Sequence, residues 1–160
     1  MEINTEELVF RKMGENDLNI FIKLRLDFLS EINKDLTEKN KILIEDSLKK
    51  YYTKYLLKNE FIGIICEYIG TVISTAFLAI NEKPANYNFV NGKIGTLLNV
   101  YTYPEYRKNG ISTKILDLII KEAKEQNVSE IELTATKDGE KLYYKFGFNE
   151  SEMKYMKLII

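Results

Sequence analysis

The stretch PEYRKNGIS, from Pro104 to Ser112, joins a run of β-branched and aromatic residues to a segment with helical periodicity. A surface loop needs no particular charge, yet Arg107 and Lys108 precede Gly110 here. Glycine permits a tight turn and the close approach of a ligand to the backbone. The first amides of the following helix lack internal acceptors and lie at the positive end of its dipole. The junction therefore predicts a site for a phosphate or pyrophosphate.

Two well-known phosphate loops are excluded at this junction. The P-loop needs a second glycine upstream of its Gly-Lys-Ser/Thr end, and the stretch NGISTK has no such glycine at the required spacing. The dinucleotide fingerprint GxGxxG is absent as well. Taken by itself, the junction is also compatible with a plain surface loop that carries two solvated cations.

Sequence patterns on both sides of the junction predict alternating strands and helices. Alternating or β-branched runs predict strands over residues 8–13, 60–68, 71–80, 94–103, 130–136 and at the end of 149–160. Helical spacing of apolar residues predicts helices over residues 17–32, 37–58, 112–127 and within 138–146. Hairpins give antiparallel pairs, whereas the strand–helix–strand crossover in the second half demands a parallel pair. We therefore expect an α/β fold with a mixed sheet, in one domain that spans residues 1–160.

Composition excludes several classes of protein and site. Hydrophobic residues make up 45% and charged residues 29%, which is a globular balance, and the net charge of −1 argues against a nucleic-acid partner. The absence of histidine excludes Cys–His and Ser–His–Asp sites. Cys66 is the single cysteine, so we expect a buried thiol with no internal disulfide. Carboxylates and one thiol make a poor zinc site, so we expect no metal.

The N-terminal segment MEINTEELVF is acidic and lacks the pattern of a signal peptide. No apolar run approaches the roughly 20 residues that cross a bilayer. We expect a soluble, cytoplasmic protein with no membrane partner.

Three stretches together resemble the GNAT superfamily of N-acetyltransferases. RKNGIS, which ends at Ser112, is similar to motif A, R/Q-x-x-G-x-G/A, but has serine where glycine or alanine is usual. NVYTYPEY looks like the hydrophobic strand before that motif, and KLYYKFGF (Lys141–Phe148) resembles the L-Y-x-x-x-G-F signature. The spacing of the motifs and the order of elements match the family from about Ile94 to Phe148.

The resemblance implies a mostly antiparallel sheet with helices on both faces, in which the parallel fourth and fifth strands splay apart. It implies acetyl-CoA as co-substrate in that splay, with no metal. The pyrophosphate would rest on the amides of residues 108–113, and the pantetheine arm would pair with the backbone of residues 100–102. The implied coenzyme-binding residues are Val100, Tyr101, Thr102, Arg107, Lys108, Asn109, Gly110, Ile111, Ser112 and Thr113.

The resemblance also implies roles in catalysis. A backbone amide at Val100 or Tyr101 would stabilise the oxyanion that forms when an amine attacks the thioester. Tyr143 matches the family tyrosine that protonates the departing CoA thiolate. A phenol of pKa ~10 and a thiol of pKa ~8.5 are close enough for this transfer. Core packing of the ring is the alternative reading of Tyr143.

The general base is not evident, because the strand IGTLLNVYTY lacks the acid that many relatives have there. Asn99 can position the amine or a water molecule. Glu67 is one candidate for the general base, and deprotonation through bulk-connected water is the alternative. Arg25 and Glu31 would read charged ends of a small acceptor if they line its groove. Otherwise Arg25 is a cation at the core edge with a buried stem.

We expect transfer of an acetyl group from acetyl-CoA to a primary amine by direct attack in a ternary complex. The acceptor is either a small molecule or a protein amine. A non-catalytic module that binds or senses acyl-CoA, and a plain α/β interaction domain, are the alternatives. A homodimer is compatible with the sequence. The sequence decides neither the oligomeric state nor the acyl-chain preference.

Overall fold

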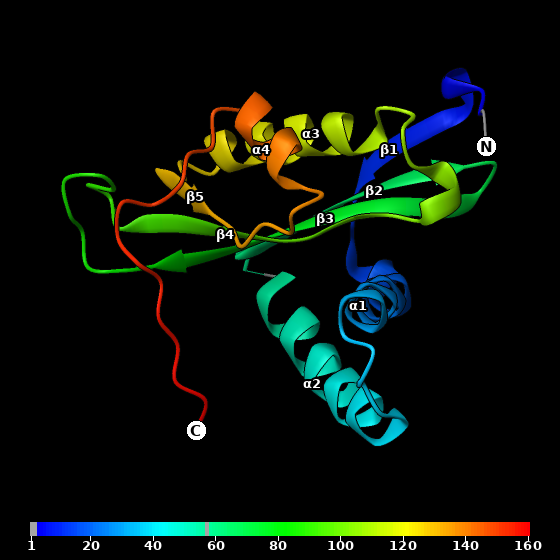
Figure 1. Cartoon of the computed structure of the whole chain (residues 1–160), viewed down its shortest axis with the longest axis horizontal. Coiled ribbons are helices and arrows are strands. Elements are labelled where there is room, and N and C mark those ends of the chain that lie inside the picture. The colour runs from blue at the N-terminus through cyan, green and yellow to red at the C-terminus, as the bar shows by residue number, and fades with distance from the viewer. Residues whose placement is uncertain (1–2, 57) are drawn as a thin grey trace.

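The computed structural model describes residues 3–56 and 58–160, and a five-stranded sheet runs through it (Figure 1). The strands lie side by side in chain order: β1 (Leu8–Lys12), β2 (Phe61–Tyr68), β3 (Thr71–Glu82), β4 (Lys93–Thr102) and β5 (Glu130–Glu132). Strands β1 to β4 pair antiparallel, and β4 pairs with β5 in parallel. The predicted mixed sheet, in which the fourth and fifth strands are parallel, is confirmed.

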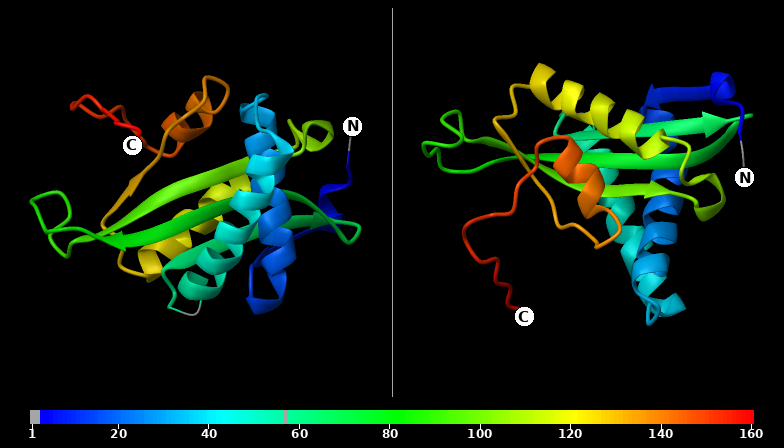
Figure 2. Two further views of the ribbon diagram at one scale, coloured as in Figure 1. Left: turned by 90° about the horizontal axis from the view of Figure 1, so that it is seen from below. Right: turned by 45° about the horizontal axis from the view of Figure 1, so that its top comes forward.

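Helices cover both faces of the sheet, as the resemblance implied. On one face α1 (Leu18–Ile32) and α2 (Glu38–Leu56) lie side by side, and on the other lie α3 (Ile111–Glu125) and α4 (Glu140–Lys145) (Figures 1 and 2). Short 3-10 turns precede β1, α1 and α3, at Thr5–Glu7, Glu15–Asp17 and Pro104–Tyr106. No helix in the described part of the chain is long and apolar enough to cross a membrane.

Strand β2 shows why the molecule forms two core layers. Its residues Ile62, Ile64 and Cys66 pack with α3, whereas Phe61 and Ile65 pack with α1 and α2. Successive side chains of a strand point to opposite faces of the sheet. An unbroken apolar strand therefore requires a cover on both faces, which the two helix pairs provide.

Aromatic packing fixes α1 and α2 on their face of the sheet. Phe21 of α1 lies 4.7 Å from the ring of Tyr52 and 5.0 Å from the ring of Phe77, measured between centroids. The Tyr52 hydroxyl donates a hydrogen bond of 2.6 Å to the carbonyl oxygen of Gly14, and burial raises the pKa of Tyr52 to about 12. This layer places one face of α1 against the later part of β4.

The prediction of a strand at the C-terminal end is wrong. Residues 151–160 form no strand, their side chains are exposed, and the segment leads away from the sheet (Figure 2). A strand is stable only where a neighbouring strand takes up its backbone hydrogen bonds, and none lies beside this segment. The fifth strand is shorter than expected for a similar reason, since β5 ends at Glu132 after pairing with only three residues of β4.

Candidate functional site

One edge of β4 is open at its C-terminal half. Strand β5 pairs with Ile94, Gly95 and Thr96 and then diverges, whereas β4 continues to Thr102 (Figure 2). Residues 97–102 therefore have no strand partner on the β5 side in the described chain. Backbone amides at an open strand edge can pair with an extended amide-containing ligand.

A β-bulge interrupts β4 at this open part. Leu98 is opposite Phe77 and Tyr101 is opposite Thr75, so that two residues of β4 face one residue of β3. Asn99, the first of the two, has a φ of 54°, a left-handed conformation that asparagine tolerates. The bulge changes the direction of the strand immediately before Val100 and Tyr101.

The loop after β4 leads to the N-terminus of α3, which begins after Gly110 with a φ of 74°. The first hydrogen bond of the helix joins the Lys114 amide to the Gly110 carbonyl oxygen at 3.2 Å. The amides of residues 111–113 precede this bond, so they have no acceptor within the helix. A Cβ atom built on Gly110 meets nothing within 4 Å, so the space before the turn is open. Free amides, a positive dipole end and open space suit an anion.

Ser112 belongs to a chain of hydroxyls that joins α3 to the sheet. Its Oγ lies 2.8 Å from Oγ1 of Thr102, which lies 2.7 Å from Oγ of Ser74 on β3. The Ser74 hydroxyl also donates to the carbonyl oxygen of Tyr101 at 2.8 Å. The serine that departs from motif A thus turns its side chain toward β4, and the turn at Gly110 is kept.

The side chain of Arg107 holds the loop against α1. Its Nε donates to the Thr102 carbonyl oxygen at 2.8 Å, and its Nη2 lies 2.6 Å from Oε1 of Glu31. Although partial burial opposes it, hydrogen bonds from Arg107 and Tyr101 lower the pKa of Glu31. The structure thus brings the predicted residues Arg107 and Glu31 together. Binding of the coenzyme by Arg107 stays a prediction.

Of the remaining loop residues, Lys108 is exposed and has a φ of 68°. The side-chain amide of Asn109 donates to the carbonyl oxygens of Tyr106 and Arg107, at 3.0 and 3.2 Å. Ile111 is buried in the core, so only its backbone faces the open space. The predicted residues 107–113 therefore run from the loop into the first turn of α3.

Tyr143 lies on α4 and packs on the same core layer as Val100. Its ring centroid is 5.8 Å from that of Phe148, and its hydroxyl has no hydrogen-bond partner among the described residues. Burial raises the pKa of Tyr143, which keeps the phenol protonated at neutral pH. The neighbouring Tyr144 is exposed and donates to Oε1 of Glu150 at 2.7 Å.

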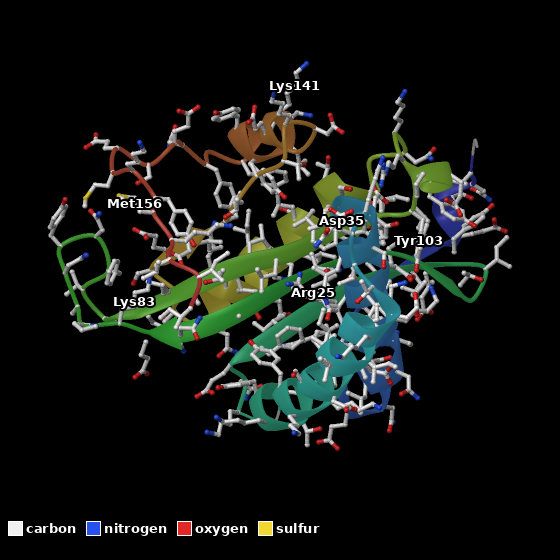
Figure 3. The ribbon with its side chains drawn as sticks, turned by 60° about the horizontal axis from the view of Figure 1, so that its bottom comes forward. Arg25, Asp35, Lys83, Tyr103, Lys141 and Met156 are labelled. Carbon is white, nitrogen blue, oxygen red and sulfur yellow. The ribbon has the colours of Figure 1, made fainter. Side chains whose placement is uncertain are left out.

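Asn99 and Arg25 meet on the other side of β4, the side that α1 covers. Nη1 of Arg25 donates to Oδ1 of Asn99 at 3.2 Å, and Nδ2 of Asn99 donates to the Leu24 carbonyl oxygen at 3.3 Å. Figure 3 shows Arg25, which is part of α1, on the side of Tyr103, whereas Lys83 lies toward the opposite end of the sheet. The buried Asn99 is thus held on both sides of its amide.

Glu67 is not brought to these residues. It lies on β2, which β3 separates from β4, and its Oε1 accepts a hydrogen bond of 2.9 Å from Nε of Arg11. The guanidinium of Arg11 also binds both carboxylate oxygens of Asp17. A carboxylate that is paired in this way is a weak candidate for a general base at β4.

A polar cluster beside the site was not predicted from the sequence. Nζ of Lys23 lies 2.6 Å from both Oδ2 of Asp27 and the hydroxyl of Tyr103, and this hydroxyl donates to Asp27. Burial, followed by the bond to Asp27, raises the pKa of Tyr103. A salt bridge at helical spacing was predictable for Lys23 and Asp27, but the tyrosine that joins them comes from another element.

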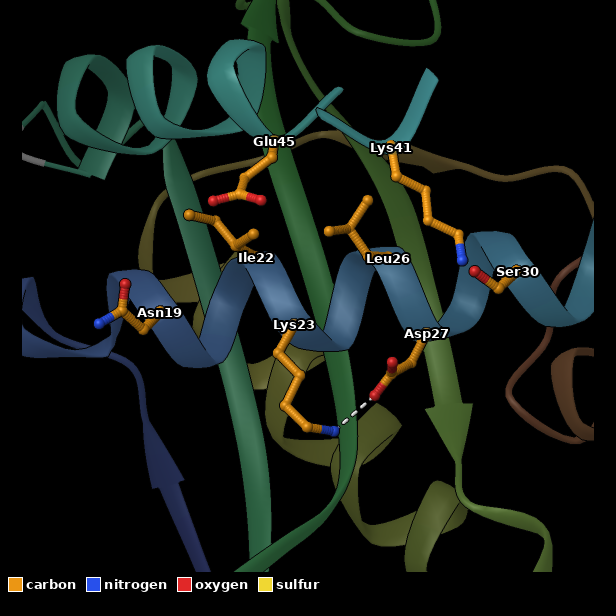
Figure 4. Close-up of a pocket in the computed structure, with 8 residues that line it drawn as sticks. All are labelled: Asn19, Ile22, Lys23, Leu26, Asp27, Ser30, Lys41 and Glu45. Carbon is orange, nitrogen blue, oxygen red and sulfur yellow. Dashed lines mark hydrogen bonds and ion pairs between the residues drawn. The ribbon is translucent and has the colours of Figure 1, made fainter. Parts of the chain in front are cut away.

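A surface hollow lies between α1 and α2, apart from the open edge of β4 (Figure 4). The residues that line it are Asn19, Ile22, Lys23, Leu26, Asp27, Ser30, Lys41 and Glu45. Among the described residues, no three acidic, cysteine or histidine side chains are grouped so that they could hold a metal ion.

Comparison with models of protein families finds a match to this chain. A model of the acetyltransferase (GNAT) family matches residues 26–148, which include β4, the loop after it and α3. Among curated proteins, no sequence matches this chain significantly.

Solved structures share the fold over nearly the whole chain. A predicted acetyltransferase from Clostridium acetobutylicum, solved with acetyl-CoA, is 29% identical, with a TM-score of 0.84 over 95% of this chain and 96% of that one. A GCN5-related N-acetyltransferase from Ralstonia eutropha JMP134 is 21% identical, with a TM-score of 0.82 over 94% and 98%. AAC(6')-Iy, solved with the bisubstrate analogue CoA-S-monomethyl-acetylneamine, is 14% identical, with a TM-score of 0.70 over 96% and 98%.

Proposed function

Because the chain belongs to the GNAT family of acetyltransferases, which use acetyl-CoA as co-substrate, we propose that it transfers the acetyl group to a primary amine. The amine attacks the thioester directly, in a ternary complex. The acceptor is a small molecule or an amine of a protein. Residues 1–160 act as one domain in this proposal.

One observation carries the proposal: a short loop joins the open edge of β4 to the free amides at the start of α3. The edge of β4 over residues 97–102 has no strand partner on the β5 side, and the helix offers the amides of residues 111–113. The pantetheine arm is an amide chain and fits the strand edge. The pyrophosphate is an anion and fits the amides at the start of the helix. A single elongated ligand that carries an amide chain and an anionic group would bind along the β4 edge and at the start of α3.

The residues of β4 and α4 would supply the chemistry. The thioester carbonyl, bound near the bulge, would accept a hydrogen bond from the amide of Val100 or Tyr101, and this bond strengthens as the oxygen becomes negative. Tyr143, whose protonated hydroxyl has no hydrogen-bond partner in the described part of the chain, would donate its proton to the departing thiolate. The side chains of Val100 and Tyr143 pack on the same core layer, which supports the action of both residues on one ligand.

The amine must lose a proton before it attacks, and no side chain on β4 can accept it. Glu67 is engaged by Arg11, so we propose that water takes this proton to the solvent. Asn99, held between Arg25 and α1, would orient the amine or this water. Turnover should then rise with pH as the free amine becomes more abundant.

Thiol release tests the proposal. Purified protein is incubated with acetyl-CoA and a panel of primary amines, and free thiol is measured with a chromogenic disulfide. We expect release that depends on an amine, together with a thermal shift by acetyl-CoA, since a ligand at 100 times its Kd adds about 2.7 kcal/mol of stability. Absence of both effects would contradict the proposal.

A non-catalytic module that binds acyl-CoA is the second candidate. It is favoured by one observation, the lack of any carboxylate on β4. This candidate predicts the thermal shift by acetyl-CoA without thiol release for any amine, whereas an acetyltransferase gives both.

A further inference from the structure

Arg25 is a half-buried cation that has no acidic partner among the described residues. Its guanidinium donates one hydrogen bond, to Asn99 at 3.2 Å, and its central carbon lies 5.8 Å from the centre of the Phe28 ring. The other arginines, Arg11 and Arg107, both pair with carboxylates. A guanidinium has five N–H donors, so most of those on Arg25 are unused by the protein.

The acidic residues that follow Arg25 on α1 are engaged elsewhere. Asp27 pairs with Lys23 at 2.6 Å, and Glu31 pairs with Arg107 at 2.6 Å. Neither carboxylate neutralises Arg25.

A partly buried charge without a counterion is unfavourable in the free protein. Burial lowers the pKa of Arg25, in keeping with the partial removal of its guanidinium from water. An arginine that only covers the core edge would extend its head group into water instead. Arg25 is turned inward to Asn99, so a ligand that brings a negative charge would complete this site.

The position of Asn99 connects this cation to the reaction. Asn99 lies at the β4 bulge and directly precedes Val100, whose amide is a proposed donor to the thioester carbonyl. The hydrogen bond from Nδ2 of Asn99 to the Leu24 carbonyl oxygen fixes the side-chain oxygen that Arg25 contacts. A group bound by Arg25 would therefore lie on the α1 side of β4, opposite the core layer of Tyr143.

We propose that Arg25 binds an anionic group, a carboxylate or a phosphate, on the amine that accepts the acetyl group. The planar guanidinium matches either group with two parallel hydrogen bonds. This inference rests on the proposed N-acetyltransferase function and narrows its acceptors to amines that also carry an acidic group.

Matched pairs of amines test the preference. Thiol release from acetyl-CoA is measured with 4-aminobutyrate against butylamine, and with glucosamine 6-phosphate against glucosamine, which distinguishes carboxylate from phosphate. We expect kcat/KM for the anionic member of at least one pair to be higher by about 10- to 100-fold, as for a hydrogen bond to a charged group. Equal values within both pairs, or higher values for the uncharged members, would overturn the proposal.

Variants of α1 assign the preference to Arg25. Arg25→Gln should reduce the ratio within the preferred pair to near one, and Arg25→Lys should restore part of it as a point charge. Lys23→Gln removes a cation from the same helix that is already paired with Asp27, so it should leave the ratio unchanged. An equal loss in Arg25→Gln and Lys23→Gln would assign the effect to net charge and contradict a specific site.

A measurement without catalysis separates this inference from the proposed function. Butyrate and inorganic phosphate carry the anionic group but no amine, and their effect on the thermal unfolding of the unliganded protein is compared in wild type and Arg25→Gln. Stabilisation by one of them in wild type alone supports the anion site, even if no amine releases thiol and the acetyltransferase proposal fails. If neither anion stabilises wild type, or both proteins respond equally, the anion site is refuted even if amines are acetylated.

Discussion

At the scale of single residues, serine at position 112 illustrates how a departure from a family motif is accommodated. Glycine or alanine would leave the Thr102 hydroxyl without this partner, whereas Ser112 continues the hydroxyl chain from Ser74 through Thr102. Each of the three side chains comes from a different element. The serine therefore ties the start of α3 to the end of β4, while its backbone amide stays available.

Replacement of Tyr143 by phenylalanine separates its hydroxyl from its ring. Packing on Phe148 and the core should survive, so stability and the binding of acetyl-CoA should change little. Turnover should fall by about 10- to 100-fold, because the thiolate would leave without a positioned acid. Steady-state kinetics and a thermal-shift titration with acetyl-CoA measure the two effects.

The adjacent tyrosine provides the control. Tyr144→Phe removes a hydroxyl that is exposed and bonded to Glu150, so turnover should stay at the wild-type level. Full turnover in Tyr143→Phe would mean that the hydroxyl of Tyr143 has no part in catalysis and that the residue is only structural.

The backbone conformation at a site residue could be predicted from the sequence, but the partners of side chains could not. Gly110 is recognisable because few residues other than glycine adopt the left-handed turn, and the prediction needs no distant contact. The ion pair of Arg107 with Glu31 joins residues 76 positions apart, and the sequence contains many other carboxylates. The same holds for the contact of Arg25 with Asn99.

At the scale of elements, the start of α3 can be tested by two matched glycines. Gly110 and Gly70 both have a φ of 74°, and a Cβ added to either meets nothing within 4 Å. Gly110→Ala and Gly70→Ala should therefore each lower the free energy of unfolding by about 1 kcal/mol, the strain of a left-handed alanine. Only Gly110→Ala should weaken acetyl-CoA binding, because its methyl group enters the space proposed for the pyrophosphate. Calorimetric titration and chemical unfolding measure both quantities, and equal affinity in the two variants would argue against the pyrophosphate site.

Elements that carry their own pattern were predictable, whereas elements that need a neighbour were not. The predicted bounds are close to those of α1, α2, α3 and β1 to β4, because each of these segments has its own apolar periodicity. The terminal segment and the end of β5 have strand-like patterns too. Pairing decides whether such a segment forms a strand, and the divergence of β5 from β4 is not visible in either pattern.

Removal of residues 151–160 tests the correction to the predicted final strand. The segment is exposed throughout and forms no strand pairs, so the shortened protein should unfold at the wild-type temperature within about 1 °C. Differential scanning calorimetry gives the comparison. A fall of several degrees would mean that this segment packs on the sheet in solution.

At the scale of the whole molecule, the two core layers contact the end of β4 from opposite faces of the sheet. The layer of α3 and α4 includes Val100 and Tyr143, and the layer of α1 and α2 reaches Asn99. Coenzyme and acceptor can thus be recognised by different layers, with β4 between them. In the proposed function, the relative position of α1 and the sheet would set how the acceptor meets the thioester.

One ion-pair network fixes the N-terminal end of α1 to the edge of the sheet. Asp17, directly before α1, accepts two hydrogen bonds from Arg11 of β1, at 2.7 and 2.8 Å, and one from the Gly14 amide at 2.8 Å. Arg11 also pairs with Glu67 of β2. The bonds from Arg11 lower the pKa of Asp17 in the folded protein, although partial burial opposes this.

Because the folded pKa of Asp17 is lowered, its contribution to stability is complete above the unfolded value of about 3.9 and is lost as the pH falls through the folded pKa. Asp17→Asn should therefore lower the free energy of unfolding at pH 7 by about 1–3 kcal/mol and flatten its decline below about pH 4. Urea unfolding across pH measures this. Asp46→Asn, which changes an exposed carboxylate on α2, should leave both the stability and its pH dependence near wild type. If the two variants behave alike, Asp17 does not hold α1 to the sheet.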